Sequence, residues 1–375
     1  MAEKKALLLD AARVLERQID EAAGRLESAL VGKRPLLVRH HGDADGVCGA
    51  IAVYRAVKNA WGESEGRAWF LQSNTAAYAE EDARRDAEKI AELVGEGEKP
   101  LAIFIDFAGN EESLEQLGLV RRAGAEILLI DHHPTRAPLG SLVDTLVSPW
   151  SAGAGSELSA GYLTCEVVRR ASKAEVEELA WISLSADKSP LARKSKMAEK
   201  AASVLDYIAS QAKRTNPVEA GEAVLASRRK LEDVFAEASQ KLEEAVARAR
   251  KTLKLKRLAN GFVVALVKLD RALAKGEYPT RGRICGEIHD SLATSERGPL
   301  VTIAYASDVF NFRANEEAKG RGFKANELIQ KLKGELTNAV EAGGGHYAAA
   351  AVKLRPGFMR IALEFFLNEI GALQR

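Results

Sequence analysis

Three short apolar runs in the first half of the chain each end in aspartate or histidine, and this pattern constrains the fold more than any other feature. The runs cover residues 35–38, 101–105 and 126–130, and helical patterns lie between them. Apolar strands that alternate with helices are typical of a parallel sheet with helices on both faces. In such sheets, ligands bind where the carboxyl ends of the strands meet. The sequence therefore predicts an α/β domain with a functional site at its strand ends.

Further elements of this first domain follow from apolar periodicity and from turn residues. The sequence predicts helices at residues 4–31, 47–61, 111–123, 155–171 and 175–186, and a strand within residues 142–148.

The 375 residues exceed the length of one typical compact domain. We expect a metal-binding catalytic domain over residues 1–189, a helical arm or linker over 190–258, and a smaller mixed α/β domain over 259–375. The last domain is predicted from strands at 261–267, 300–305, 309–312 and 348–354 and from helices at 325–341 and 358–371.

The middle segment, residues 190–258, is basic and carries a heptad pattern. It holds 16 Lys/Arg against 9 Asp/Glu, whereas the whole chain has a net charge of +1. The apolar positions of the heptad are Leu231, Phe235, Ala238, Leu242, Ala245 and Ala249. Such a seam suits a helical hairpin or a coiled-coil contact. It predicts either an arm for self-association through residues 221–258 or for nucleic-acid contact, or a linker helix packed on its own domain.

The cysteines and the apolar runs indicate the cellular compartment. The cysteines Cys48, Cys165 and Cys285 form no CxxC pair, which fits buried thiols in a reducing environment. No apolar run approaches the roughly 18 to 20 residues that span a bilayer, and the first 26 residues lack a signal-type apolar region. We expect a soluble, cytoplasmic protein without membrane contact. The scarcity of Asn, Gln, Met and Cys beside many charged residues tilts towards a thermophile.

The polar residues at the strand ends form a joint set with metal-binding chemistry. The set is His41, Asp43, Asp45, Asp106, Asp131, His132, His133 and Asp187. Carboxylate oxygens and imidazole nitrogens together suit manganese, and also magnesium, iron or zinc. Taken singly, Asp43, Asp106 or Asp187 has an equally good explanation as a helix cap. Several aspartates that converge need cations, because like charges at close range disfavour ionisation.

Two other phosphate-binding patterns are missing from the sequence. It has no GxxxxGK[ST] motif and no GxGxxG followed by a helix, which disfavours nucleoside-triphosphate hydrolysis and dinucleotide redox chemistry.

The order of these motifs resembles the DHH phosphoesterase superfamily, which includes RecJ-like and nanoRNase-like enzymes. The motifs are His41-Gly-Asp-Ala-Asp-Gly46, Asp106 after a strand, Asp131-His132-His133, and Asp187 after a helix. The C-terminal part is similar to the family's DHHA1 domain, with Gly343-Gly344-Gly345-His346 and Arg313 at the matching positions. The resemblance covers nearly the whole chain except residues 190–258 and the first 30.

The resemblance implies a site for two divalent ions, with Mn²⁺ expected and Mg²⁺ as the alternative. Asp106 would bridge the ions, His41 and Asp43 would complete one site, and Asp45, His132 and Asp187 would complete the other. His40 is a rival to His41, because the spacing of this histidine varies within the family. Asp131 would support a ligand histidine, and His133 would contact the phosphate or assist the leaving group.

The DHHA1-like part would hold the substrate phosphate. Arg313 would bind it with a forked geometry. Gly343, Gly344 and Gly345 would let backbone N–H groups approach it, and His346 would donate to it. Aromatic candidates for base stacking are Tyr305, Phe310, Phe312 and Tyr347, with a core role as the alternative reading.

The implied function is a single-strand-specific DNA or RNA exonuclease that releases mononucleotides, with a lean towards 3′ to 5′ polarity and an archaeal source. One alternative is a hydrolase of dinucleotides and short oligonucleotides. An alternative of another class is a Cdc45-like scaffold in replication or repair. A replication or repair protein is a further candidate partner.

Overall fold

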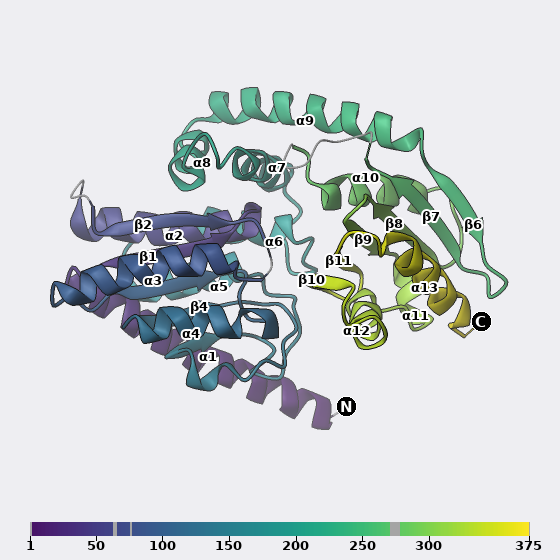
Figure 1. Ribbon diagram of the computed structural model, residues 1–375. Helices are drawn as coiled ribbons and strands as arrows, with labels where there is room; N and C mark the ends of the chain where they lie inside the picture. Colours follow the sequence, from purple (N-terminus) through teal and green to yellow (C-terminus); the bar gives the residue numbers. More distant parts are fainter. Residues whose placement is uncertain (1, 63–65, 76, 271–277, 375) are drawn as a thin grey trace. The chain divides into compact units, whose positions relative to one another are not determined.

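The computed structural model describes residues 2–62, 66–75, 77–270 and 278–374, and it divides the chain into two compact units, Met1–Phe235 and Ala236–Arg375. The first unit contains a five-stranded parallel sheet in the order β2-β1-β3-β4-β5 (Figure 1). Its strands are β1 (Leu36–His41), β2 (Ala68–Ser73), β3 (Leu101–Ile105), β4 (Glu126–Ile130) and β5 (Thr145–Val147). The parallel sheet confirms the predicted α/β class.

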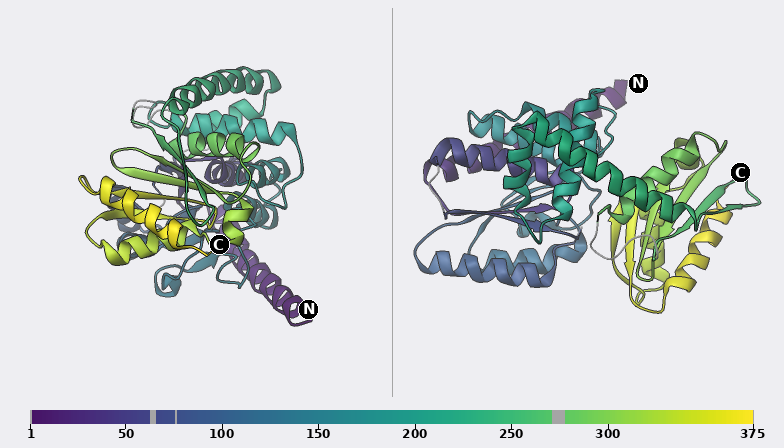
Figure 2. Two further views of the ribbon diagram at one scale, coloured as in Figure 1. Left: turned by 90° about the vertical axis from the view of Figure 1, so that its right-hand side faces the viewer. Right: turned by 90° about the horizontal axis from the view of Figure 1, so that it is seen from above.

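Helices cover both faces of this sheet, as the view from above in Figure 2 shows. Alternate residues of a strand point to opposite faces, so Leu36 and Val38 join the core beneath α1, α2 and α5, whereas Leu37 joins the core with α3 and α4. The helices of the first unit are α1 (Ala2–Val31), α2 (Ala44–Trp61), α3 (Glu80–Gly95), α4 (Leu114–Arg122), α5 (Ala160–Ala171), α6 (Glu177–Ala186), α7 (Lys196–Ser210) and α8 (Pro217–Leu225).

Several elements of the first unit differ from the sequence prediction, and helix α3 (Glu80–Gly95) was not predicted at all. Strand β2 was not predicted, because it lies at the sheet edge and is half-buried at most positions, which leaves no clear alternation of apolar and polar residues. Helix α5 begins at Ala160 and not at residue 155, because the backbone of Ser159 before it is extended. The start of α5 matters because it lies against the candidate site.

The heptad segment forms α9 (Arg228–Arg250), one continuous helix. Leu231 belongs to the core of the first unit, and Ala245 and Ala249 belong to a core cluster of the second. Ala238 is also buried. These positions of the seam are therefore already covered within the single chain, and self-association through the helix stays a prediction.

The second unit is a six-stranded mixed sheet in the order β10-β11-β9-β8-β7-β6. Its strands are β6 (Lys254–Arg257), β7 (Val263–Lys268), β8 (Leu300–Tyr305), β9 (Val309–Ala314), β10 (Val340–Gly345) and β11 (Ala349–Leu354). Its helices are α10 (Arg281–Ala293), α11 (Glu316–Gly320), α12 (Ala325–Glu335) and α13 (Met359–Ala372). The predicted mixed α/β domain is confirmed.

Helix α12 ends six residues earlier than the prediction of a helix to residue 341. The residues that follow enter strand β10, which carries the glycine run. No helix in the described part of the chain is long and apolar enough to cross a membrane.

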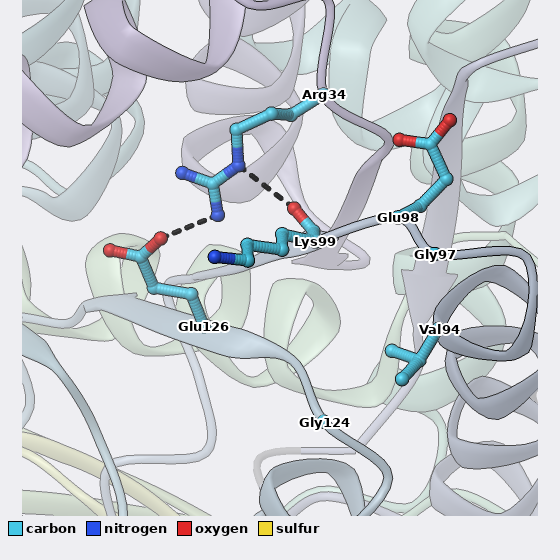
Figure 3. A pocket seen from close by; sticks show the side chains of 7 residues that line it. All are labelled: Arg34, Val94, Gly97, Glu98, Lys99, Gly124 and Glu126. Atoms are coloured by element: carbon cyan, nitrogen blue, oxygen red, sulfur yellow. Dashed lines mark hydrogen bonds and ion pairs between the residues drawn. The ribbon is translucent and has the colours of Figure 1, made fainter.

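A hollow of about 450 Å³ lies at the amino ends of the parallel strands, opposite the end where such folds bind ligands (Figure 3). The two carboxylates and the guanidinium that line it are paired, and Glu98 contacts Arg67 at 2.7 Å. Glu126 contacts Arg34 at 2.5 Å and also contacts Arg25, and Arg34 Nε donates to the carbonyl of Lys99 at 2.8 Å. Because Arg34 is bonded to acceptors from the starts of β3 and β4, we assign this hollow a structural role in joining the strand ends.

We predict that Glu126→Gln lowers the free energy of unfolding by about 1 kcal/mol at pH 7. Burial opposes ionisation of Glu126, but Arg34 and Arg25 outweigh it and lower the pKa of this carboxyl. A lowered folded-state pKa stabilises the fold above the unfolded-state value, roughly 4.3, and this contribution disappears as the pH falls through the folded-state pKa. Urea unfolding at pH 7 and near pH 3 should therefore show a difference that shrinks in acid. A constant difference would mean that the carboxylate charge is not involved.

Candidate metal centre

The predicted strand-end residues of the first unit converge. His41 ends β1, Asp106 follows β3, and Asp131 with His132 and His133 follows β4. These three strands are neighbours in the sheet and run parallel, so their carboxyl ends meet along one edge. The remaining members come from helix ends: Asp43 and Asp45 from the start of α2, and Asp187 from the end of α6.

One cluster consists of His41, Asp43 and Asp106, each with one ligand-type atom within 4.8 Å of the others. His41 Nδ1 lies 2.7 Å from Asp43 Oδ2 and 3.4 Å from Asp106 Oδ2. Burial opposes protonation of His41, but the charges of Asp43 and Asp106 raise its pKa well above the ordinary value. The three groups therefore favour a positive charge between them.

A second cluster consists of Asp45, His132 and Asp187. His132 Nε2 lies 3.1 Å from Asp187 Oδ2 and 3.9 Å from Asp45 Oδ2. Burial works against protonation of His132, yet Asp187 and Asp45 raise the pKa of this ring. This cluster also has an excess of acidic groups around one imidazole.

Asp106 lies between the two clusters. Its Oδ2 atom lies near His41, and its Oδ1 atom lies 3.4 Å from His132 Nε2. The side chain is 2% exposed, and Oδ1 has no hydrogen-bond partner among the described residues. Burial, followed by the charges of Asp43 and Asp45, raises the pKa of Asp106 well above its usual value.

The backbone at Asp106 adopts a φ of 67°, in the left-handed region that costs energy for residues other than glycine. A buried carboxylate that is both unsatisfied and strained destabilises a fold. Such features concentrate at functional sites, where the surrounding structure holds them in place.

Asp131 is fully occupied within the protein. Its Oδ1 atom accepts from the backbone N–H of His133 at 3.0 Å and contacts His133 Nδ1 at 2.8 Å, and its Oδ2 atom accepts from Gly109 N at 3.0 Å. A Cβ atom on Gly109 would lie 2.5 Å from Asp131 Oδ2, so a side chain there would displace this carboxylate. The contact at Nδ1 fixes the orientation of the His133 ring. Nε2 is the other ring nitrogen through which His133 can bond.

The structure separates His41 from its rival His40. Since alternate strand residues point to opposite faces, His40 lies in the core and is completely buried. Burial lowers the pKa of His40 to about 4, and its Nε2 atom has no hydrogen-bond partner among the described residues. Within the first unit, His41 and not His40 belongs to a cluster of metal-ligand type.

The N-cap explanation is confirmed for Asp43 alone among the three aspartates for which it was an alternative, since Asp187 stands at the C-terminal end of α6 and Asp106 caps none of the described helices. Asp43 is the N-cap of α2 and accepts from Gly46 N at 3.0 Å. Asp45 accepts at the start of α5, from Ala160 N and from Gly161 N, both at 2.9 Å. Capping uses part of each carboxylate and fixes its orientation.

Sequence reasoning missed the support beneath Asp45. Ser183 Oγ donates to Asp45 Oδ1, and Ser159 Oγ contacts Ser183 Oγ, with both serines completely buried. A Cβ atom on Gly161 would lie 2.6 Å from the carbonyl of Asp45, so this glycine allows α2 and α5 to approach. Asp206 was missed too, and it accepts from Ala44 N at 2.8 Å. The serine before an Ala-Gly pair was the available signal, since serine is a common N-cap.

In the second unit, Arg313 lies on β9 and pairs in register with Ala349 of β11. Gly343, Gly344 and Gly345 form the end of β10, and His346 begins the turn into β11. Gly345 has a φ of 128°, and a Cβ atom on Gly343 would press on Val352 at 3.0 Å. At Gly344 a Cβ atom would meet nothing within 4 Å, so packing among the described residues does not explain this glycine.

Comparison with known proteins fits this geometry. The model of the DHH family, N-terminal domain, matches residues 35–187, which contain the predicted metal ligands. The uncharacterized protein MJ1198 of Methanocaldococcus jannaschii is 25% identical over 95% of this chain, and the chain spans 54% of that relative's length.

Solved structures show the same fold. A DHH-domain structure described as a member of the s1p family of ribosomal proteins has 26% identity and a TM-score of 0.86, over 98% of this chain and 93% of that one. RecJ from Thermus thermophilus in complex with Mn²⁺ has 15% identity and a TM-score of 0.60, over 94% of this chain and 54% of that one. Residues 35–187 of this chain therefore match the N-terminal domain of the DHH family, and over nearly its whole length the chain shares the fold of a solved DHH-domain structure.

Proposed function

We propose that this chain is a metal-dependent phosphodiesterase that uses two divalent ions. The observation that carries the proposal is Asp106, a buried carboxylate whose two oxygens lie near two different clusters of aspartate and histidine. Carboxylates that link two such groups are the feature that a pair of metal ions requires.

The donor sets fit divalent ions that accept oxygen and nitrogen. His41, Asp43 and Asp106 would hold one ion, and Asp45, His132 and Asp187, with Asp106, would hold the other. When bound, the ions supply neutralisation of the phosphate charge and a more acidic water molecule. We propose Mn²⁺ as the native ion and Mg²⁺ as the alternative.

The chain's own groups would orient the substrate. Asp131 fixes the His133 ring through Nδ1, so Nε2 would meet a phosphate oxygen or the leaving group. In the second unit, Arg313 and His346 would bind phosphate, and the open space at Gly344 would let the backbone approach it.

Within this class we propose a single-strand-specific DNA or RNA exonuclease that releases mononucleotides, with its polarity unassigned and a lean towards 3′ to 5′. The likeness in fold to RecJ structures bound to manganese supports a nuclease. Single-stranded nucleic acid would be the main partner, with a replication or repair protein and a second copy of the chain as further partners. A cytoplasmic location fits the three free, buried cysteines.

The test is degradation of 5′-labelled and 3′-labelled single strands of DNA and of RNA, with Mn²⁺, with Mg²⁺ and with EDTA. We expect a metal-dependent ladder, and the label that is lost first reports the polarity. Cleavage of dinucleotides alone would replace the exonuclease by a short-oligonucleotide hydrolase. The absence of any metal-dependent cleavage would refute the enzyme and favour a Cdc45-like scaffold.

A further inference from the structure

The outermost strand of the second sheet, β6, carries lysines on one face. Lys254 pairs in register with Leu266 of β7, and Lys256 pairs with Val264. Paired residues share a face of the sheet and alternate residues point to opposite faces, so Lys268 lies on the same face, two residues beyond Leu266. Three ammonium groups therefore project from one side of this edge.

Among the residues that the structure describes, this side of the sheet is left open near the lysines. The opposite face is covered, because Val267 of β7 packs with Ala245 and Ala249 of α9 and with Ile284 of α10. On the lysine side, Val264 is completely buried beneath the core around Phe366, but Leu266 is only partly buried and Lys268 is exposed. The core that covers this face of the sheet therefore ends along β7.

An aromatic ring lies at the inner border of the open area. Tyr305 of β8 pairs in register with Lys268 and so lies on the same face. Its ring stacks on Phe310, with centroids 5.8 Å apart and planes at 21°. Phe310 and Phe312 are buried, so they have the core role that was the alternative to base stacking. Tyr305 is partly exposed.

The charge on this side is mostly positive. Residues 254–269 contain no Asp or Glu, and Asp270, whose charge follows burial in raising the pKa of Tyr305, is an acidic residue beside it. Arg257 pairs with Glu296 at 2.8 Å, and Lys268 lies 3.7 Å from Asp270. Lys254 and Lys256 are exposed, and neither has an ion-pair partner in the described ranges.

A structural explanation covers part of this pattern. Lysines on edge strands prevent sheets from pairing with one another, which would account for Lys254 and Lys256. It does not account for a partly exposed tyrosine on the same face, next to a third lysine. Cations interleaved with an aromatic ring are the usual means of binding single-stranded nucleic acid.

We propose that the open sheet face, formed by Lys254, Lys256, Leu266, Lys268 and Tyr305, binds the backbone of a single-stranded nucleic acid and stacks one base on Tyr305. Lys254 and Lys256 are roughly 7 Å apart along the strand, which is comparable to the separation of neighbouring phosphates in an extended single strand. The open sheet face lies at the edge opposite to β10 and its glycine run. It is therefore a second contact for long strands and deepens the exonuclease proposal, on which it rests.

The test measures binding of a labelled 20-nucleotide single strand to the full chain in EDTA, by fluorescence anisotropy over a range of salt concentrations. For K254Q/K256Q we expect roughly tenfold weaker binding at low salt, and a slope of log K against log salt reduced by about 1.4, at about 0.7 per phosphate contact. Tyr305→Ala should weaken binding roughly five- to a hundredfold, and Tyr305→Phe should restore it. The matched control K331Q/R355Q removes the same charge elsewhere in the second unit and should leave the slope unchanged.

An unchanged affinity and slope in K254Q/K256Q would overturn the inference, and this surface variant decides the matter if Tyr305→Ala unfolds. Displacement of the oligonucleotide by polyglutamate at equal charge concentration would assign the face to an acidic protein segment and would also overturn it. Because binding in EDTA needs no hydrolysis, an inactive chain whose binding depends on these residues would refute the exonuclease but not the nucleic-acid site. An active nuclease whose binding is unaffected by these substitutions would refute the nucleic-acid site but not the exonuclease.

Discussion

Replacing Asp106 by asparagine is expected to lower metal-dependent hydrolysis by at least roughly a thousandfold while leaving the fold intact. Loss of a residue that only supports a metal ligand costs roughly 10- to 100-fold, and Asp106 contacts both clusters directly. The same change should keep or raise the stability of the metal-free protein, because burial and the charges of Asp43 and Asp45 disfavour an ionised carboxylate at this position. Asparagine also tolerates the positive φ at this position.

Metal binding provides a second measurement that does not depend on the substrate. Saturating Mn²⁺ stabilises a protein that binds it only in the folded state, by about 2.7 kcal/mol at a hundred times Kd. We expect Mn²⁺ to raise the Tm of the unaltered chain and to have little effect on the Asp106→Asn variant. Asp206→Asn is the matched control, since Asp206 contacts Ala44 at the start of α2 but belongs to neither cluster. An equal Mn²⁺ shift in D106N would refute the bridging role.

The second large effect is expected at Asp86. We predict that Asp86→Ala lowers the free energy of unfolding by about 3–5 kcal/mol. Arg39 of β1 makes a forked contact with Asp86 of α3, at 2.5 and 2.6 Å, and both side chains are nearly inaccessible, at 4% and 2% exposed. Tyr78 Oη also donates to Asp86. Burial works against the guanidinium, but Asp86 outweighs it and raises the pKa of Arg39, so removal of the carboxylate leaves a buried charge unpaired.

A double substitution separates the lost pair from the lost packing. Replacing a buried ion pair by apolar residues of similar size is often neutral or stabilising. We therefore expect R39M/D86L to recover most of the stability that Asp86→Ala loses in urea unfolding. A loss below about 1 kcal/mol in D86A, with an unchanged m-value, would show that Arg39 finds another partner such as Asp82.

The elements that the sequence predicted are those whose own residues carry the full hydrophobic pattern of a strand or a helix. Residues 101–105 and 127–130 are continuous apolar runs, and a strand buried on both faces needs such a run. Strand β2 and the glycine run of β10 had no such signal. The first is half-buried at a sheet edge, and the second becomes a strand only through its pairing with β11.

The site shows the same division. The residue types at strand ends predicted the metal chemistry, because Asp and His that follow parallel strands must meet at one edge. The choice between His40 and His41 needed the strand's register relative to its two faces, which places His40 in the core. The support of Asp45 by Ser183 and Gly161 comes from residues more than a hundred positions away, so no local pattern contains it.

By itself, the sequence determined the alternation of strands and helices, the order of the acidic motifs and the membership of the set at the strand ends. These depend on side-chain chemistry and on short-range periodicity, which act within a few residues. Only the tertiary structure decided that Asp106 reaches both clusters, that Asp131 is occupied in orienting His133, and that Tyr305 stays open to solvent while Phe310 does not. These depend on which distant elements pack on each residue, and packing is a property of the whole fold.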